Sequence, residues 1–203
     1  MSEELADLPA PRPVVHTEVV ARGLVFDLLR DRVDLGDVTV SRDYLRHPGA
    51  VAVIALDPQD RVLLVRQYRH AVRTELWEPP AGLLDVPGEP PHRTAARELA
   101  EEADLVAGSW WRLASFYSTP GFTDERVEVF VARDLRPVAD AERHVRTAEE
   151  AQLVHRWWPL DTALEAVLGA RIASPSAVIG ILAAVAARAR GWSDLVPVDT
   201  RPG

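Results

Sequence analysis

The feature that most constrains this chain is a loop rich in proline and glycine that leads into a short acidic helix, AGLLDVPGEPPHRTAARELAEEADL at 81–105. Good helix formers fill residues 90–104, and the prolines stand at the start, where the first helical turn accepts them. On a helical wheel, Glu98, Glu101 and Glu102 fall within roughly 100° of arc, beside an arc of small and apolar residues. The pattern predicts a helix that packs by one face and carries three crowded carboxylates next to it.

Two explanations of these carboxylates stay open from spacing alone. The helix could present an ordinary solvated face, on which Arg97 pairs with Glu101 one turn later. That pair leaves Glu98 and Glu102 four residues apart with like charge, at a cost of roughly a few tenths of a kcal/mol. A divalent cation would remove this repulsion, because Mg²⁺ prefers carboxylate, water and phosphate oxygens as ligands.

Composition narrows the class of protein. The 203 residues include no cysteine, which excludes disulfides, thiolate zinc sites and a cysteine nucleophile and fits a reducing cytoplasm. No apolar run reaches about 18 residues and the acidic start lacks the features of a signal peptide, so we expect a soluble, cytoplasmic protein with no membrane contact. The formal charge of -8 and the scattered arginines disfavour nucleic acid as a partner. An anionic small molecule could still bind where arginines or metal ions offset this charge.

Apolar periodicity predicts a mixture of strands and helices. Strands are expected at 17–29, 34–43, 50–57, 61–69, 110–118, 126–135 and 153–160. Helices are expected at 90–104, at 161–170 with Asp161 as N-cap, and at 175–190 with Ser174 as N-cap. The runs at 50–57 and 61–69 flank a short polar turn and therefore predict a buried hairpin. The acidic stretch 136–152 has no period and is expected to be a mobile loop.

Strands and helices that mix without regular alternation predict an α/β (α+β) sandwich, in which helices flank a mixed β-sheet and the first strands form a small antiparallel meander. The expected organisation is a loose tail at 1–13, an N-terminal β region at 14–46, a main domain at 47–191 and a C-terminal tail at 192–203.

The acidic helix and its loop resemble the Nudix box, the signature of hydrolases that cleave a nucleoside diphosphate linked to another moiety. The pattern needs a glycine, a glutamate and then Arg-Glu-apolar-any-Glu-Glu-any-Gly, which Gly82, Glu89 and the run 97–105 follow with two departures. Six residues instead of five separate Gly82 from Glu89, and Asp104 replaces the last glycine. Asp104 stands where a left-handed residue is wanted; aspartate tolerates that conformation, although its charge opposes the helix dipole.

The resemblance implies a Mg²⁺- or Mn²⁺-dependent enzyme. It makes Glu98 and Glu102 metal ligands, Glu101 a nearby or shared ligand with a catalytic role, and the carbonyl of Ala81 a further ligand. Arg97 would orient the glutamates by ion pairs. For Glu89, a role in holding the loop at the helix start is the better interpretation.

Outside the box, the chain is similar to the ADP-ribose pyrophosphatase branch of that family, because HPGAVAVIALD, VRQYRHAVRTELWEPPAGLLD, TPGFTDE and RWWPLDTAL occur in the order of that branch. By itself Arg69 is a surface arginine at a strand end, and the TPGF run is a hairpin turn. The resemblance makes Arg69 a phosphate contact and Glu125 a ribose contact. It assigns further substrate contacts to Leu83 and to Arg42, Thr119, Pro120 and Gly121.

The resemblance also implies a glutamate from the acidic loop that helps to activate water, which is Glu150 or, in second place, Glu149. We therefore expect hydrolysis of ADP-ribose to AMP and ribose 5-phosphate, by a homodimer joined through the N-terminal strands. Two alternatives are a Nudix hydrolase of another nucleoside diphosphate sugar and a nucleotide-binding sensor without catalysis. Intact Glu98, Glu101 and Glu102 argue against the sensor.

Overall fold

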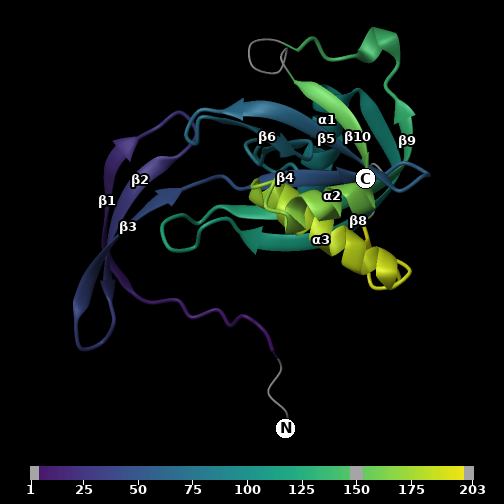
Figure 1. Cartoon of the computed structure of the whole chain (residues 1–203). Helices are drawn as coiled ribbons and strands as arrows, with labels where there is room; N and C mark the ends of the chain where they lie inside the picture. The colour runs from purple at the N-terminus through teal and green to yellow at the C-terminus, as the bar shows by residue number, and fades with distance from the viewer. Residues whose placement is uncertain (1–4, 147–152, 199–203) are drawn as a thin grey trace. The chain divides into compact units, whose positions relative to one another are not determined.

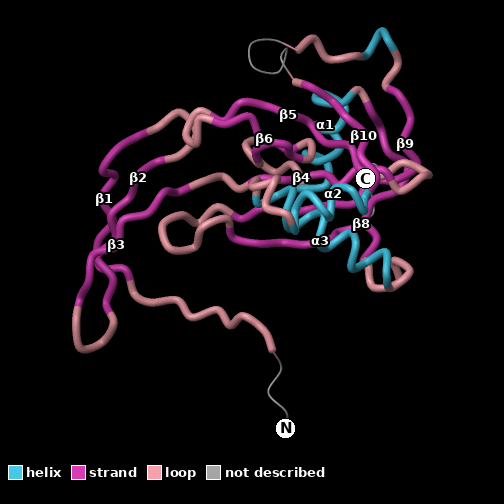
Figure 2. The backbone as a smooth tube through the Cα atoms, in the orientation of Figure 1, coloured by secondary structure: helices cyan, strands magenta, loops and turns pink. Residues whose placement is uncertain are grey.

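The computed structural model describes residues 5–146 and 153–198, whose course is drawn in Figures 1 and 2. The chain divides into two compact units, Met1–His47 with Thr119–Glu125, and Pro48–Ser118 with Arg126–Gly203. None of the helices in the described ranges is long and apolar enough to cross a membrane.

The first unit contains an antiparallel three-stranded sheet in the order β1 (Val14–Arg22), β2 (Asp27–Asp34) and β3 (Thr39–Arg46). Across β2 and β3, Arg30 Nε donates to Asp43 Oδ1 at 2.7 Å. Leu29 is the one residue of these three strands that is fully buried. The predicted meander is confirmed.

A Gly-Asp turn between the first strands was predicted, but the strand boundaries at 17–29 and 34–43 are wrong, because the chain turns inside each of these ranges. The Gly23 N–H donates to Phe26 O at 2.9 Å, and a Cβ atom on Gly23 would lie 2.4 Å from that oxygen. A glycine therefore permits a turn inside the first predicted strand. The second turn begins at Asp34, whose Oδ1 accepts the Gly36 N–H at 2.8 Å.

The segment Thr119–Glu125 belongs to the first unit through bonds to the end of β3 and the residue that follows it. The Leu45 N–H donates to Phe122 O at 2.8 Å, and the His47 N–H donates to Asp124 Oδ1 at 2.8 Å. The segment is thus held by main-chain and side-chain hydrogen bonds.

Two sheets lie in the described part of the second unit. The five-stranded sheet has the order β11 (Val196–Pro197), β8 (Leu105–Tyr117), β9 (Arg126–Pro137), β4 (Ala50–Ala55) and β7 (Ala81–Leu83). Only the β4–β9 pair in it is parallel, so the sheet is mixed. The antiparallel three-stranded sheet has the order β10 (Val154–Pro159), β5 (Arg61–Arg69) and β6 (Thr74–Glu78).

The predicted hairpin of 50–57 with 61–69 is wrong. Strands β4 and β5 lie in different sheets and are joined by a single bridge between Leu56 and Val62. Both strands are central in their sheets, and the buried residues are 51–55 in β4 and 62–65 in β5. Burial was therefore predicted correctly, but continuous apolarity does not identify the neighbouring strand.

Helices cover both faces of the five-stranded sheet, as the alternation along β4 shows. Ala52 and Ile54 pack in a core with α2 (Leu160–Leu168) and α3 (Pro175–Ala189). Val51 and Val53 pack in a second core with Ala95 and Leu99 of α1 (Pro91–Ala103). The predicted sandwich, a mixed sheet flanked by helices, is confirmed.

The helix ends follow their sequence signals with one exception. Proline stands at the start of α1, and Asp104 ends this helix in the left-handed conformation at φ 53°, as predicted. Ser174 precedes the proline that starts α3. Asp161 is not the N-cap of α2, because that helix starts at Leu160 after Pro159; its carboxylate instead pairs with Arg188 of α3. A 3-10 turn, η1 (Asp140–Glu142), follows β9.

Candidate active site

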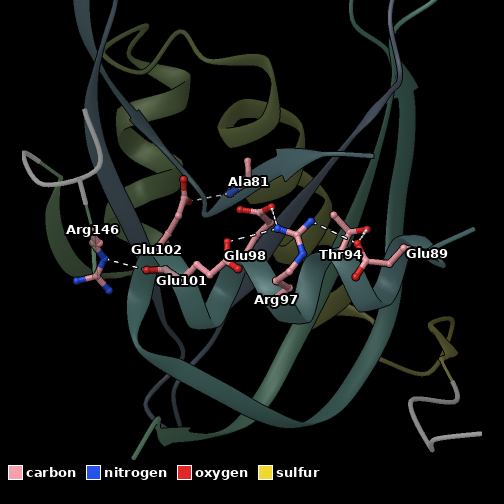
Figure 3. Close-up of polar contacts among 8 residues, drawn as sticks. All are labelled: Ala81, Glu89, Thr94, Arg97, Glu98, Glu101, Glu102 and Arg146. Carbon is pink, nitrogen blue, oxygen red and sulfur yellow. Dashed lines mark hydrogen bonds and ion pairs between the residues drawn. The ribbon is translucent and has the colours of Figure 1, made fainter. Parts of the chain in front are cut away.

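Helix α1 and strand β7 bring the predicted acidic residues together (Figure 3). Arg97 lies among them: its Nη1 donates to Glu98 Oε1 at 2.6 Å and to Glu101 Oε2 at 3.3 Å. The expected pair of Arg97 with Glu101 is present, and the same guanidinium reaches Glu98. Two of the three carboxylates therefore share one arginine.

Glu98 occupies space that exists because residue 82 is glycine. A Cβ atom on Gly82 would lie 2.1 Å from Glu98 Cδ. The Glu98 side chain is 13% exposed. Burial, together with the charges of Glu101 and Asp85 and against the opposing effect of Arg97, raises the pKa of Glu98 to about 7. At neutral pH this carboxyl is close to half protonated, a state from which a bound cation would displace the proton.

Glu102 joins the last turn of α1 to the start of β7. It is 9% exposed, and its Oε2 accepts the Ala81 N–H at 3.0 Å (Figure 3). The hydrogen bond brings the backbone of Ala81 beside the Glu102 carboxylate. The two predicted ligands thus lie next to each other.

Glu89 fastens the loop to the start of the helix, as its position predicts. Its Oε2 accepts Thr94 Oγ1 at 2.8 Å and Arg97 Nη2 at 3.3 Å. Desolvation raises the pKa of Glu89, but the hydrogen bonds from Thr94 and Arg97 outweigh it and hold the pKa below its ordinary value. Glu89 is therefore ionised and satisfied by protein donors.

The donor atoms fit a hard divalent cation by their chemistry. Glu98 and Glu102 are shielded carboxylates that flank β7, and Ala81 adds a main-chain oxygen. Within the described residues, no three carboxylate or imidazole groups already converge closely enough to hold a metal ion. Arg97 bonds Oε1 of Glu98, and a carboxylate can bind a metal ion through its other oxygen while it keeps such a bond.

Arg69 has a buried carboxylate partner that sequence reasoning missed. Arg69 Nε and Nη2 donate to Glu78 Oε2 at 3.0 and 2.7 Å, and Gln67 Nε2 donates to the same oxygen at 2.9 Å. The Glu78 side chain is 9% exposed, whereas that of Arg69 is 47% exposed. The guanidinium therefore has one edge fixed and a large exposed surface. A carboxylate directly before Pro79 and Pro80, in a strand with apolar neighbours, is the signal that could have identified Glu78.

The other predicted substrate contacts fall in both units. Leu83 is half-buried in β7 and pairs with Ala50 of β4. Arg42, exposed on β3, and the residues Thr119, Pro120, Gly121 and Glu125 belong to the first unit.

Within that unit, the Thr119 carbonyl accepts the Phe122 and Thr123 N–H groups at 3.1 Å each, which makes the predicted turn. Glu125 Oε1 lies 3.7 Å from His47 Nδ1. Arg42 Nη1 donates to the Ser41 carbonyl at 2.9 Å. The predicted Glu149 and Glu150 lie outside the described residues.

Comparison with known proteins gives concordant similarities. The sequence model of the NUDIX domain matches residues 46–176. An ADP-ribose pyrophosphatase of Mycobacterium tuberculosis is 43% identical over 187 residues, covering 92% of this chain and 88% of that protein. An ADP-ribose pyrophosphatase of Bacillus subtilis is 40% identical over 122 residues, covering 60% and 65%.

A methanol dehydrogenase activator of Bacillus methanolicus is 36% identical over 168 residues, covering 82% of this chain and 89% of that protein. Among solved structures, an ADP compounds hydrolase matches with a TM-score of 0.66 and 22% identity, over 92% of this chain and 99% of the other. At that identity the structural likeness shows the fold.

Proposed function

Because this chain belongs to the NUDIX domain family, we propose that it hydrolyses ADP-ribose to AMP and ribose 5-phosphate with Mg²⁺ or Mn²⁺ as cofactor. The observation that carries the proposal is the junction of α1 with β7, where Glu98 and Glu102 lie with Ala81 as a set of hard oxygen donors. The choice of ADP-ribose is supported by the M. tuberculosis and B. subtilis relatives, which are ADP-ribose pyrophosphatases.

In the proposed reaction a water oxygen bonds to one phosphorus of the diphosphate, the bond from that phosphorus to the bridging oxygen breaks, and a carboxylate takes the proton of the water. Glu98, Glu102 and Ala81 would hold the metal, which when bound supplies positive charge to the phosphate oxygens and so also offsets the net charge of -8. Glu101 would share the metal or act as a catalytic carboxylate. Glu150, or Glu149, is proposed as the acceptor of the proton.

Arg69 is the proposed phosphate contact of this chain. The bonds from Gln67 and Arg69 to the buried Glu78 leave the guanidinium oriented, and a planar fork of donors suits phosphate oxygens. Leu83, two residues after Ala81, is proposed to line the same substrate site.

The first unit is proposed to supply the remaining substrate contacts, Arg42, Glu125 and the turn at 119–121, and to form a homodimer. Every residue of β1 is exposed, including Val14, Val15, Val19 and Val20. Apolar side chains exposed along an edge strand are typical of a surface that a partner covers. Size-exclusion chromatography with light scattering tests the dimer, and a monomer would exclude it.

The test of the activity is Glu102→Gln, which keeps the size of the side chain and removes its charge. Turnover of ADP-ribose at saturating Mg²⁺ should fall by at least about a hundredfold, because the lost ligand supports several kcal/mol of charge stabilisation. Release of AMP and ribose 5-phosphate is followed by chromatography. Glu165→Gln is the matched control, since Glu165 is exposed on α2. Near-normal turnover by Glu102→Gln would refute the proposed metal site.

A panel of nucleoside diphosphate sugars compared by kcat/KM tests the substrate separately. If another sugar nucleotide is clearly preferred, the proposed diphosphate hydrolysis stands and that nucleotide replaces ADP-ribose as the proposed substrate.

A further inference from the structure

The last turn of α1 gathers negative charge with no basic residue of its own. Glu101, Glu102 and Asp104 lie within four positions at the C-terminal end, and the last turn contains no basic side chain. A helix C-terminus already carries a partial negative charge, so acidic residues there are unfavourable. Asp104 adds to this charge at the position where the family pattern has glycine. The end of the helix therefore needs a cation from elsewhere in the chain.

Arg146 supplies this cation from 45 residues beyond Glu101 in sequence (Figure 3). Its Nε donates to the Glu101 carbonyl oxygen at 2.9 Å, and its Nη2 lies 2.7 Å from Asp104 Oδ2. The side chains of Arg146 and Asp104 are 21% and 26% exposed, so the pair is better shielded from solvent than an ordinary surface ion pair. One guanidinium thus donates a hydrogen bond to a terminal carbonyl of the helix and forms an ion pair, without a hydrogen bond from Nη2, with the carboxylate of its cap.

Two further contacts fix the same end of the helix. His155 Nε2, at the start of β10, donates to the Glu102 carbonyl oxygen. The Val138 N–H donates to the Asp104 carbonyl oxygen at 2.8 Å. Together with Arg146, they hold the backbone from which Glu101 and Glu102 extend.

We propose that Arg146 is a positioning residue for metal binding: its paired contacts with Glu101 and Asp104 fix the last turn of α1, and thereby the carboxylates of Glu101 and Glu102. In this chain Asp104 itself provides the left-handed helix end that glycine provides in the family pattern, and Arg146 offsets the negative charge that this aspartate adds. The inference rests on the proposed metal site, but not on ADP-ribose as the substrate.

A purely electrostatic role makes the opposite prediction. If Arg146 acted only through its charge, removing it would make the site more negative and tighten binding of a divalent cation. Arg146→Lys would then behave like the unchanged protein, because the charge is kept. A positioning role requires the fork of donors, which lysine does not have.

The experiment measures Mn²⁺ binding to the full chain by electron paramagnetic resonance of free Mn²⁺, without substrate. Arg146→Ala should weaken binding by at least about tenfold, as is typical when a partner that orients a ligand is lost. Arg146→Lys should weaken it by at least about threefold, because an ammonium group that stays paired with Asp104 does not also present the Nε donor to the Glu101 carbonyl. Asp104→Asn, which leaves the bond to the Glu101 carbonyl possible, should change binding by less than about twofold.

Arg143→Ala is the matched control, because Arg143 pairs with Asp140 in the same connection and that pair is highly exposed. It should bind Mn²⁺ as the unchanged chain does. Tighter or unchanged binding by Arg146→Ala, or unchanged binding by Arg146→Lys, would overturn the proposal. If Arg146→Ala fails to fold by circular dichroism, the lysine variant alone decides. Binding that does not respond to Glu102→Gln would instead refute the metal site itself, and absence of ADP-ribose hydrolysis would leave this result intact.

Discussion

Binding of Mg²⁺ should release protons from Glu98, and the average number released per bound ion should depend on pH. Burial raises the pKa of this carboxyl to about 7, so it carries roughly 0.9 of a proton at pH 6, 0.5 at pH 7 and 0.1 at pH 8. A metal ligand must be deprotonated, so the cation displaces what proton is present. Apparent affinity for Mg²⁺ should therefore fall roughly tenfold from pH 8 to pH 6.

Isothermal titration calorimetry of Mg²⁺ binding, in buffers of different ionisation enthalpy, counts the released protons at each pH. The Glu165→Gln variant should release as many protons per Mg²⁺ as the unchanged chain. If the Glu98→Gln variant still binds Mg²⁺, that binding should release no protons. A count near zero at pH 6, or an affinity that does not change between pH 6 and pH 8, would refute the protonation of Glu98.

The same carboxyl sets the sign of a stability effect in the metal-free protein. Its pKa is higher folded than unfolded, so the folded state binds more protons between the unfolded value and about 7. The contribution of Glu98 to the free energy of unfolding is therefore largest at acidic pH. It is lost as the pH rises through about 7.

Two further substitutions test the surroundings of the site. Gly82→Ala would place a methyl group 2.1 Å from Glu98 Cδ, so Mg²⁺ affinity and turnover should both fall by at least about tenfold. Calorimetric titration measures the affinity, and steady-state kinetics measures the turnover. Unchanged values would contradict the close contact. Glu78→Gln removes the charged partner of Arg69, so the KM for ADP-ribose should rise about tenfold at unchanged Mg²⁺ affinity. An unchanged KM would show that Arg69 does not need the Glu78 carboxylate to bind phosphate.

Features fixed by short-range chemistry could be predicted from the sequence. The helix over 90–104 was predicted from its helix formers, its proline start and the tolerance of Asp104 for a left-handed conformation, and the structure has it at Pro91–Ala103. Glu89 beside the helix start and the Arg97–Glu101 pair are likewise contacts within eight residues of sequence.

The strand boundaries at 17–29 and 34–43 failed at local turns, whereas the other failures depend on distant partners. The apolar runs of β4 and β5 indicated burial on both faces but contained no information on which strands flank them, and so the hairpin was wrong. Glu78 meets Arg69 only because β5 and β6 pair in that register. Arg146 reaches Glu101 across 45 residues, and no local pattern marks it.

The position of Thr119–Glu125 in the first unit has a consequence for how this protein can be dissected. The chain passes between the units three times, after His47, after Ser118 and after Glu125, so the first unit is discontinuous in sequence. Deleting residues 1–46 would remove Leu45, the partner of Phe122, and leave the segment 119–125 attached to the remaining chain. Such a truncation therefore removes the N-terminal strands and also the partner of segment 119–125, so its effect cannot be assigned to either change. Point substitutions, or exchange of both segments together, are the experiments that separate the roles of the two units.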